Sequence, residues 1–172
     1  GNVWCFGDKK ELVRILNKLV DPDNNIQLVG HNFLIDTTWL RSLGWDCGEE
    51  VRILDKYKID LNATENLNGV YDTVFMYHAV DECAAYDLEK TAARWLGVKP
   101  WSTSLEEWKK EYCKAKKIPA KELKGYGDVP KEILLPYAAA DAKYTYLIFK
   151  AIIPYLYSDV YKNNCWNAYW RT

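Results

Sequence analysis

Two short stretches of the sequence place a polar side chain and an aspartate four residues apart. The first contains Asn32 and Asp36 and follows a short apolar segment that ends at Gly30. The second contains Tyr137 and Asp141, which are separated by three alanines. Because four residues are about one helical turn, each pair would present both side chains on one face of a helix.

These side chains suit the chemistry of a divalent cation and a phosphate ester. A carboxylate can hold such a cation directly or through water. A phenol beside it can orient an attacking water, and an amide can bind a sugar or phosphate oxygen. Simpler roles are also open. Asn32 could cap a helix that has Asp36 in its first turn, and Tyr137 could lie at the edge of the core with Asp141 in solvent.

The sequence before residue 45 predicts alternating strands and helices. Short apolar runs predict the strands, and apolar residues at helical spacing predict the helices. Asp8 and Glu11 have the spacing of a capping box. The predicted elements are a strand at Val3–Phe6, a helix to about Val20, a strand at Ile26–Val29 and a helix at Phe33–Leu43 that ends at Gly44. This order is typical of an α/β sheet with helical crossovers.

The sequence after residue 70 predicts mainly helices. Asp72 and Thr73 lead an apolar helical run, and Asp87 caps a second helix that ends at Gly97. The inner face of that second helix is expected to comprise Leu88, Ala92, Trp95 and Leu96. The remaining predicted elements are a polar connection, rich in lysine from Lys109 to Lys124, and a helical region from Pro130 to Pro154 that restarts at Pro136.

The composition indicates a globular protein, with 49% hydrophobic and 15% aromatic residues. Five scattered cysteines favour reduced thiols, and neither a signal peptide nor an apolar run of about 20 residues is visible. We therefore expect no membrane partner and a cytoplasmic location, in the host cytoplasm for a viral protein. A net charge of -1 does not exclude a nucleic-acid substrate, because bound metal ions can supply positive charge.

Together, the two stretches resemble motifs of the DEDD exonuclease superfamily. His31-Asn32 to Asp36 resembles its second motif, and Tyr137 to Asp141 resembles its third motif in the tyrosine-containing (DEDDy) branch found in family A DNA polymerases. The segments between them fit the same family in the same order: Tyr71–Met76, Asp87–Gly97 and Gly125–Pro130. The resemblance covers roughly residues 3–155.

The resemblance implies a ribonuclease H-like fold, a mixed sheet flanked by helices, in an exonuclease domain over residues 1–155. It implies proofreading-type 3'-5' hydrolysis of the terminal phosphodiester of DNA with two Mg²⁺ or Mn²⁺ ions. Asp141 would be a direct metal ligand, and Asp36 would hold the metal site through water. Tyr137 would position the attacking water, and Asn32 would touch the substrate strand.

One departure from the family bears on catalysis. The family's first motif, Asp-x-Glu, lies on its first strand, and no Asp-x-Glu precedes Asp36. Val3–Phe6 resembles the family's third strand, so the first two strands are expected to be missing. We therefore expect a catalytically incomplete fragment of a DNA polymerase. The alternatives are a non-catalytic nucleic-acid-binding module and an exoribonuclease of the ribonuclease D type.

The expected partners follow from the same resemblance. They are the 3' end of single-stranded DNA and a polymerase domain, toward which residues 156–172 would lead. Without its first strands, the sheet would have an open edge, covered by self-association or by the aromatic tail. The lysines between Lys109 and Lys124 could guide a DNA backbone, with Trp101 and Trp108 stacking on bases. They could equally form a solvated helix face with inward-facing tryptophans.

Overall fold

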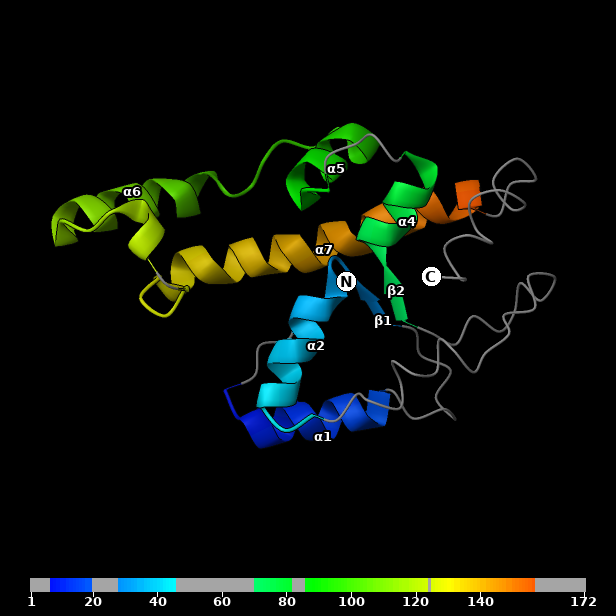
Figure 1. Cartoon of the computed structure of the whole chain (residues 1–172), viewed down its shortest axis with the longest axis horizontal. Helices are drawn as coiled ribbons and strands as arrows, with labels where there is room; N and C mark the ends of the chain where they lie inside the picture. Colours follow the sequence, from blue (N-terminus) through cyan, green and yellow to red (C-terminus); the bar gives the residue numbers. More distant parts are fainter. Residues whose placement is uncertain (1–6, 20–27, 46–69, 82–85, 124, 157–172) are drawn as a thin grey trace.

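A computed structural model describes residues 7–19, 28–45, 70–81, 86–123 and 125–156. The described chain is mostly helical, with a small parallel sheet (Figure 1). In chain order, the elements are α1 (Lys9–Leu19), β1 (Leu28–Gly30), α2 (Phe33–Ser42), β2 (Val70–Asp72), α4 (Thr73–Val80), α5 (Leu88–Leu96), α6 (Thr103–Lys116), the 3-10 helix η2 (Ala120–Glu122) and α7 (Lys131–Leu156).

The two strands fix which residues meet at the edge of the sheet. Strands β1 and β2 are parallel, and Gly30 pairs with Asp72 at their carboxyl ends. The residues that follow each strand therefore start from the same edge. In open α/β sheets this edge is where ligands bind.

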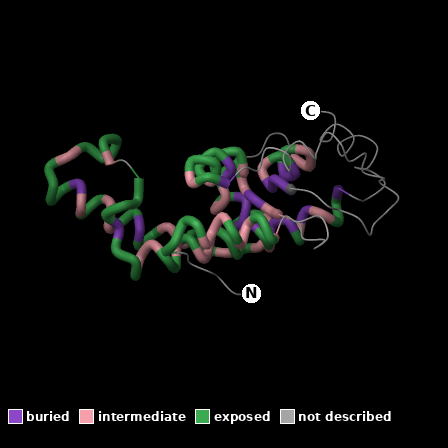
Figure 2. Tube along the Cα trace, turned by 90° about the horizontal axis from the view of Figure 1, so that it is seen from below, coloured by how far each residue is buried: buried purple, intermediate pink, exposed green. Residues whose placement is uncertain are grey.

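Helix α7 is the central element of the packing. Helices α4 and α5 pack along it, and β1 contacts it as well. The buried core consists of Tyr71, Met76, Tyr77, Ala92, Ile148, Phe149, Ile152 and Leu156. The core residues of α7 all lie in its second half. Its first half contacts α6 and is more exposed. Figure 2 shows few buried residues at the end of the molecule that α6 forms.

Most helices predicted from local signals are confirmed. Helices α1, α2, α4 and α5 begin and end within a few residues of their predicted positions. Gly97 follows α5 with a φ of 66°, the left-handed conformation that favours glycine at a helix end. The predicted capping box is only half right. Asp8 accepts the N–H of Lys10, but Glu11 pairs with Arg14 instead of reaching back.

Two predictions in the second half are wrong. The lysine-rich connection is largely helical, as the alternative of a solvated helix face allowed, because α6 buries Leu105 and Cys113 on one face while most of its lysines are exposed. Pro136 does not restart the last helix, since α7 continues through it. A proline inside a helix costs about 3 kcal/mol, and the packing of α4, α5 and the sheet along α7 offsets this cost. Strand β2, which precedes the predicted helix, was not foreseen.

The predicted fold class is confirmed in its coarse form, as helices around a parallel sheet. The larger ribonuclease H-like sheet remains a prediction. The predicted strand at Val3–Phe6 and the tail from residue 157 lie outside the described residues. No helix in the described ranges is long and apolar enough to cross a membrane.

Candidate active site

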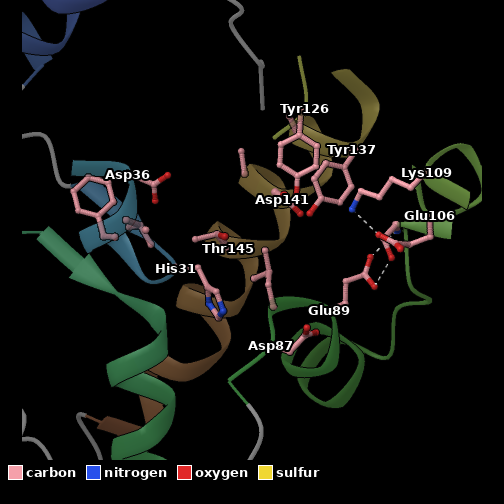
Figure 3. A pocket seen from close by; sticks show the side chains of 17 residues that line it. His31, Asp36, Asp87, Glu89, Glu106, Lys109, Tyr126, Tyr137, Asp141 and Thr145 are labelled. Atoms are coloured by element: carbon pink, nitrogen blue, oxygen red, sulfur yellow. Dashed lines mark hydrogen bonds and ion pairs between the residues drawn. The ribbon is translucent and has the colours of Figure 1, made fainter. Parts of the chain in front are cut away.

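A cavity of about 720 Å³ opens beside the carboxyl end of β1. Residues of α2, α5, α6 and α7 line it (Figure 3). Three of the four predicted site residues lie here: Asp36, Tyr137 and Asp141. The fourth, Asn32, is exposed and is not among the lining residues. The structure therefore brings together residues that are about 100 positions apart in the sequence.

Asn32 occupies the N-cap position of α2, but its side chain does not cap the helix. Its backbone is left-handed, with a φ of 58°. The capping group is the carboxylate of Asp72. It accepts the backbone N–H groups of Asn32 and Phe33 at 2.9 and 2.8 Å. The same carboxylate accepts the N–H of Val74 at 2.9 Å and so also caps α4.

His31 links the ends of the two strands. Its Nδ1 lies 2.9 Å from the Thr73 hydroxyl, and its Nε2 lies 2.8 Å from the carbonyl oxygen of Tyr86. The Thr73 hydroxyl in turn donates to the carbonyl of Gly30 at 2.9 Å. With Asp72, these bonds fix the segment between β1 and α2, the helix that carries Asp36.

On α7, Tyr137 and Asp141 lie one turn apart and face the cavity, next to Tyr126 (Figure 3). The indole N–H of Trp101 donates to Asp141 Oδ1 at 2.9 Å. Burial raises the pKa of the Asp141 carboxyl, and hydrogen bonds from Trp101 and Tyr137 oppose this rise. Burial and the Asp141 charge also raise the pKa of the Tyr137 hydroxyl. At neutral pH Tyr137 is therefore a protonated phenol that can donate a hydrogen bond.

Asp36 lies in the first turn of α2, and Figure 3 shows it on the other side of the cavity from Asp141, with His31 between them. Although its side chain is largely exposed, partial burial of the carboxylate raises the pKa of Asp36. The charge of Asp72 raises it further. Both candidate ligands therefore carry a negative charge that the surrounding protein disfavours.

The donor set suits a hard cation but is small. Carboxylate and hydroxyl oxygens are the ligands that Mg²⁺ and Mn²⁺ prefer, and a cation would offset the charge that raises both pKa values. Within the described ranges, however, no three His, Cys, Asp or Glu side chains are grouped so as to hold a metal ion. Asp36 and Asp141 are oxygen donors of the kind such a cation prefers, but the described residues do not complete a two-metal site.

Glu89, on α5, also lines the cavity and was not found from the sequence. Lys109, on α6, lines it as well and belongs to the lysine run that could guide a DNA backbone. The Lys109 ammonium pairs with Glu106 at 2.8 Å and lies 5.2 Å from the centre of the Tyr126 ring. Trp101 is partly buried and packs against the core, as the inward-facing alternative predicted for it. In the sequence, Asp72 stands before a helical run, and this position indicates that it caps the following helix, α4. It does not indicate that Asp72 also caps α2.

The raised pKa values lead to a stability prediction. Replacing Asp141 with Asn should raise the midpoint of thermal unfolding of the metal-free protein at pH 7. The ionised carboxylate is disfavoured in the folded state, whereas Asn keeps an oxygen for Trp101. The gain should be complete above the raised pKa. It should vanish as the pH falls below about 4, the pKa of an ordinary aspartate, because the carboxyl is then neutral in both states.

Thermal unfolding of the two proteins between pH 3.5 and 8 measures this effect. Glu107→Gln is the matched control, because Glu107 is exposed on α6 outside the cavity. A lower midpoint for Asp141→Asn than for the unmodified protein at pH 7 would contradict the prediction.

The fold and the site define an α/β domain with an acidic cavity at the carboxyl end of a parallel sheet. Residues 6–156 match the protein family described as 3'-5' exonuclease. The chain belongs to this family of exonuclease domains, found in family A DNA polymerases. The matched range includes both motifs, and so all of Asn32, Asp36, Tyr137 and Asp141.

The chain is similar to the DNA polymerase of Escherichia phage T5, with 25% identity over 145 residues. The aligned part is 83% of this chain and 15% of that polymerase. The chain thus spans a small part of the length of its curated relative. No solved structure matches the chain.

Proposed function

We propose that this chain is part of the proofreading-type exonuclease of a DNA polymerase, which removes nucleotides from the 3' end of single-stranded DNA. The observation that supports this best is the shared cavity, which Asp36 lines from α2 and which Tyr137 and Asp141 line from α7. The similarity to a phage DNA polymerase favours this function over that of a ribonuclease D-type exoribonuclease. We also propose that the open edge of the sheet is covered by a second copy of the chain or by its aromatic tail.

In the proposed site, Mg²⁺ or Mn²⁺ would activate water and stabilise the leaving oxygen. Asp141 would bind the cation directly, since it is half-buried on a long helix. The more exposed Asp36 would act through water. The protonated hydroxyl of Tyr137 would hold the attacking water, and Asn32, at the exposed start of α2, would touch the incoming strand.

We further propose that activity needs carboxylates beyond these two. Mg²⁺ gives up its water reluctantly, and two carboxylates would leave a second ion without a protein ligand. The other ligands would come from residues outside the described ranges or from another part of a longer protein. We expect the 172-residue chain alone to bind Mg²⁺ weakly and not to digest DNA at a useful rate.

The test is digestion of a single strand labelled at its 5' end, with Mg²⁺ or Mn²⁺. The chain is compared with the same chain preceded by the upstream segment of its gene. We expect stepwise shortening from the 3' end by the extended protein only. A strand blocked by phosphorothioate linkages at its 3' end is the control and should resist. Release of the 5' label, or cleavage of RNA in preference to DNA, would contradict the proposal.

Replacing Tyr137 with Phe should lower the turnover number of the extended protein by about 10²-fold, the usual contribution of a group that assists proton transfer. Tyr146→Phe is the matched control, since Tyr146 is an exposed tyrosine of the same helix. Equal activities for the Tyr137 variant and this control would exclude the proposed role of Tyr137.

A further inference from the structure

Trp101 makes two separate contacts with α7. Its indole N–H donates to Asp141 Oδ1 at 2.9 Å. Its ring also lies against that of Tyr144, with centroids 4.4 Å apart and planes inclined by 30°. Asp141 and Tyr144 are three residues apart, so they lie on the same side of the helix. One contact uses the edge of the indole and the other its face, and together they fix the orientation of the ring.

The backbone of Trp101 is held by a third element. The Glu89 carboxylate on α5 accepts the N–H of Trp101 at 2.9 Å. It also accepts the N–H and the hydroxyl of Ser102 at 2.6 and 2.9 Å. These three bonds anchor the start of α6 to α5. Glu89 lines the cavity, but its oxygens are used to hold the chain that bears Trp101.

We infer that Trp101 is a positioning residue that orients the Asp141 carboxylate for cation binding, and that Glu89 holds Trp101 in place. The inference rests on the proposed function, in which Asp141 is the direct metal ligand. An aspartate side chain can rotate, and a fixed donor on Oδ1 restricts this rotation. Tyr137 also donates to this carboxylate, and the lone pairs that the two donors leave would remain for the cation. Groups that orient metal ligands in this way typically change metal affinity by 10–100-fold when they are removed.

A purely structural explanation would be that a buried indole needs an acceptor. Within the described ranges, the buried indole N–H groups of Trp45 and Trp95 have no hydrogen-bond partner. The fold therefore accommodates indoles without an acceptor. Trp101, by contrast, donates to a carboxylate of the cavity. This difference favours a role directed at Asp141.

The test measures Mn²⁺ binding to the 172-residue chain by the electron paramagnetic resonance signal of free Mn²⁺. The variants are Trp101→Phe, which keeps a ring against Tyr144 but removes the N–H, and Asp141→Asn. Trp108→Phe is the matched control, because Trp108 stacks on Tyr112 in α6 and does not line the cavity. We expect Trp101→Phe to weaken binding by about 10-fold, with a cooperative thermal unfolding transition that shows the variant to be folded. The control should bind like the unmodified protein.

A second measurement needs no variant at Trp101. In a ¹H–¹⁵N spectrum, Mn²⁺ should broaden the indole signal of Trp101 before those of the other tryptophans, and Asp141→Ala should shift it. If Asp141→Asn weakens Mn²⁺ binding but Trp101→Phe stays within twofold of the unmodified protein, the positioning role is wrong and the proposed function stands. If Asp141→Asn leaves binding unchanged, the metal role of Asp141 is wrong, and the inference is overturned with it.

Discussion

Asp141→Ala is expected to lower metal-dependent digestion of single-stranded DNA by about 10³-fold or more in the protein that includes its upstream segment. A metal ion typically provides several kcal/mol of transition-state stabilisation, and each 1.4 kcal/mol or so is a factor of ten in rate. Asp141 should matter more than Asp36. It is half-buried, it projects from the long helix α7, and its orientation is fixed by Trp101.

The measurement is the rate of nucleotide release at saturating Mg²⁺, together with a thermal unfolding curve for each variant. Asp128→Ala is the control, because Asp128 is exposed, accepts a hydrogen bond from Tyr112 and does not line the cavity. The assignment of Asp141 fails if its variant keeps more than a tenth of the activity while folded. Rapid digestion by the 172-residue chain, lost in Asp141→Ala, would instead show that the chain itself supplies the remaining ligands.

The elements that could be predicted are those specified by local signals. Asp87 and Gly97 mark the two ends of α5, and the structure places both where the spacing required. The motif pairs were also local, because each lies within one turn of a helix. That both pairs line one cavity depends on how α2 and α7 are placed beside β1, and spacing alone could not establish it. That expectation came from the family resemblance.

The parts that could not be predicted depend on contacts between distant residues. The lysine-rich segment looked like a connection because its charges outnumber its apolar residues, yet Leu105 and Cys113 are enough to bury one face of α6. The bond between Trp101 and Asp141 joins residues 40 positions apart. Asp72 indicated only the start of the helix after it. Its bonds to Asn32 and Phe33 require β1 and β2 to be neighbours.

Asp72→Ala is expected to lower the free energy of unfolding by about 3 kcal/mol or more. The Asp72 side chain is buried and accepts three backbone N–H groups, at the starts of α2 and α4. A hydrogen bond to a charged group contributes about 1.5–3 kcal/mol, and a buried donor without a partner adds a cost of its own. The loss should be measured as the shift of the urea midpoint at constant slope.

Asp87→Ala is the matched control for this prediction, because the Asp87 side chain caps one helix by accepting one backbone N–H, at 3.0 Å, and is exposed. Removal of a single cap costs about 1 kcal/mol. If Asp72→Ala lowers the free energy of unfolding by no more than Asp87→Ala does, the caps of α2 and α4 do not both stabilise the fold. If it lowers this free energy by more, the start of α2 has lost its cap as well. Mn²⁺ affinity should then fall even in the folded fraction, because Asp72 fixes the segment that places Asp36 at the cavity.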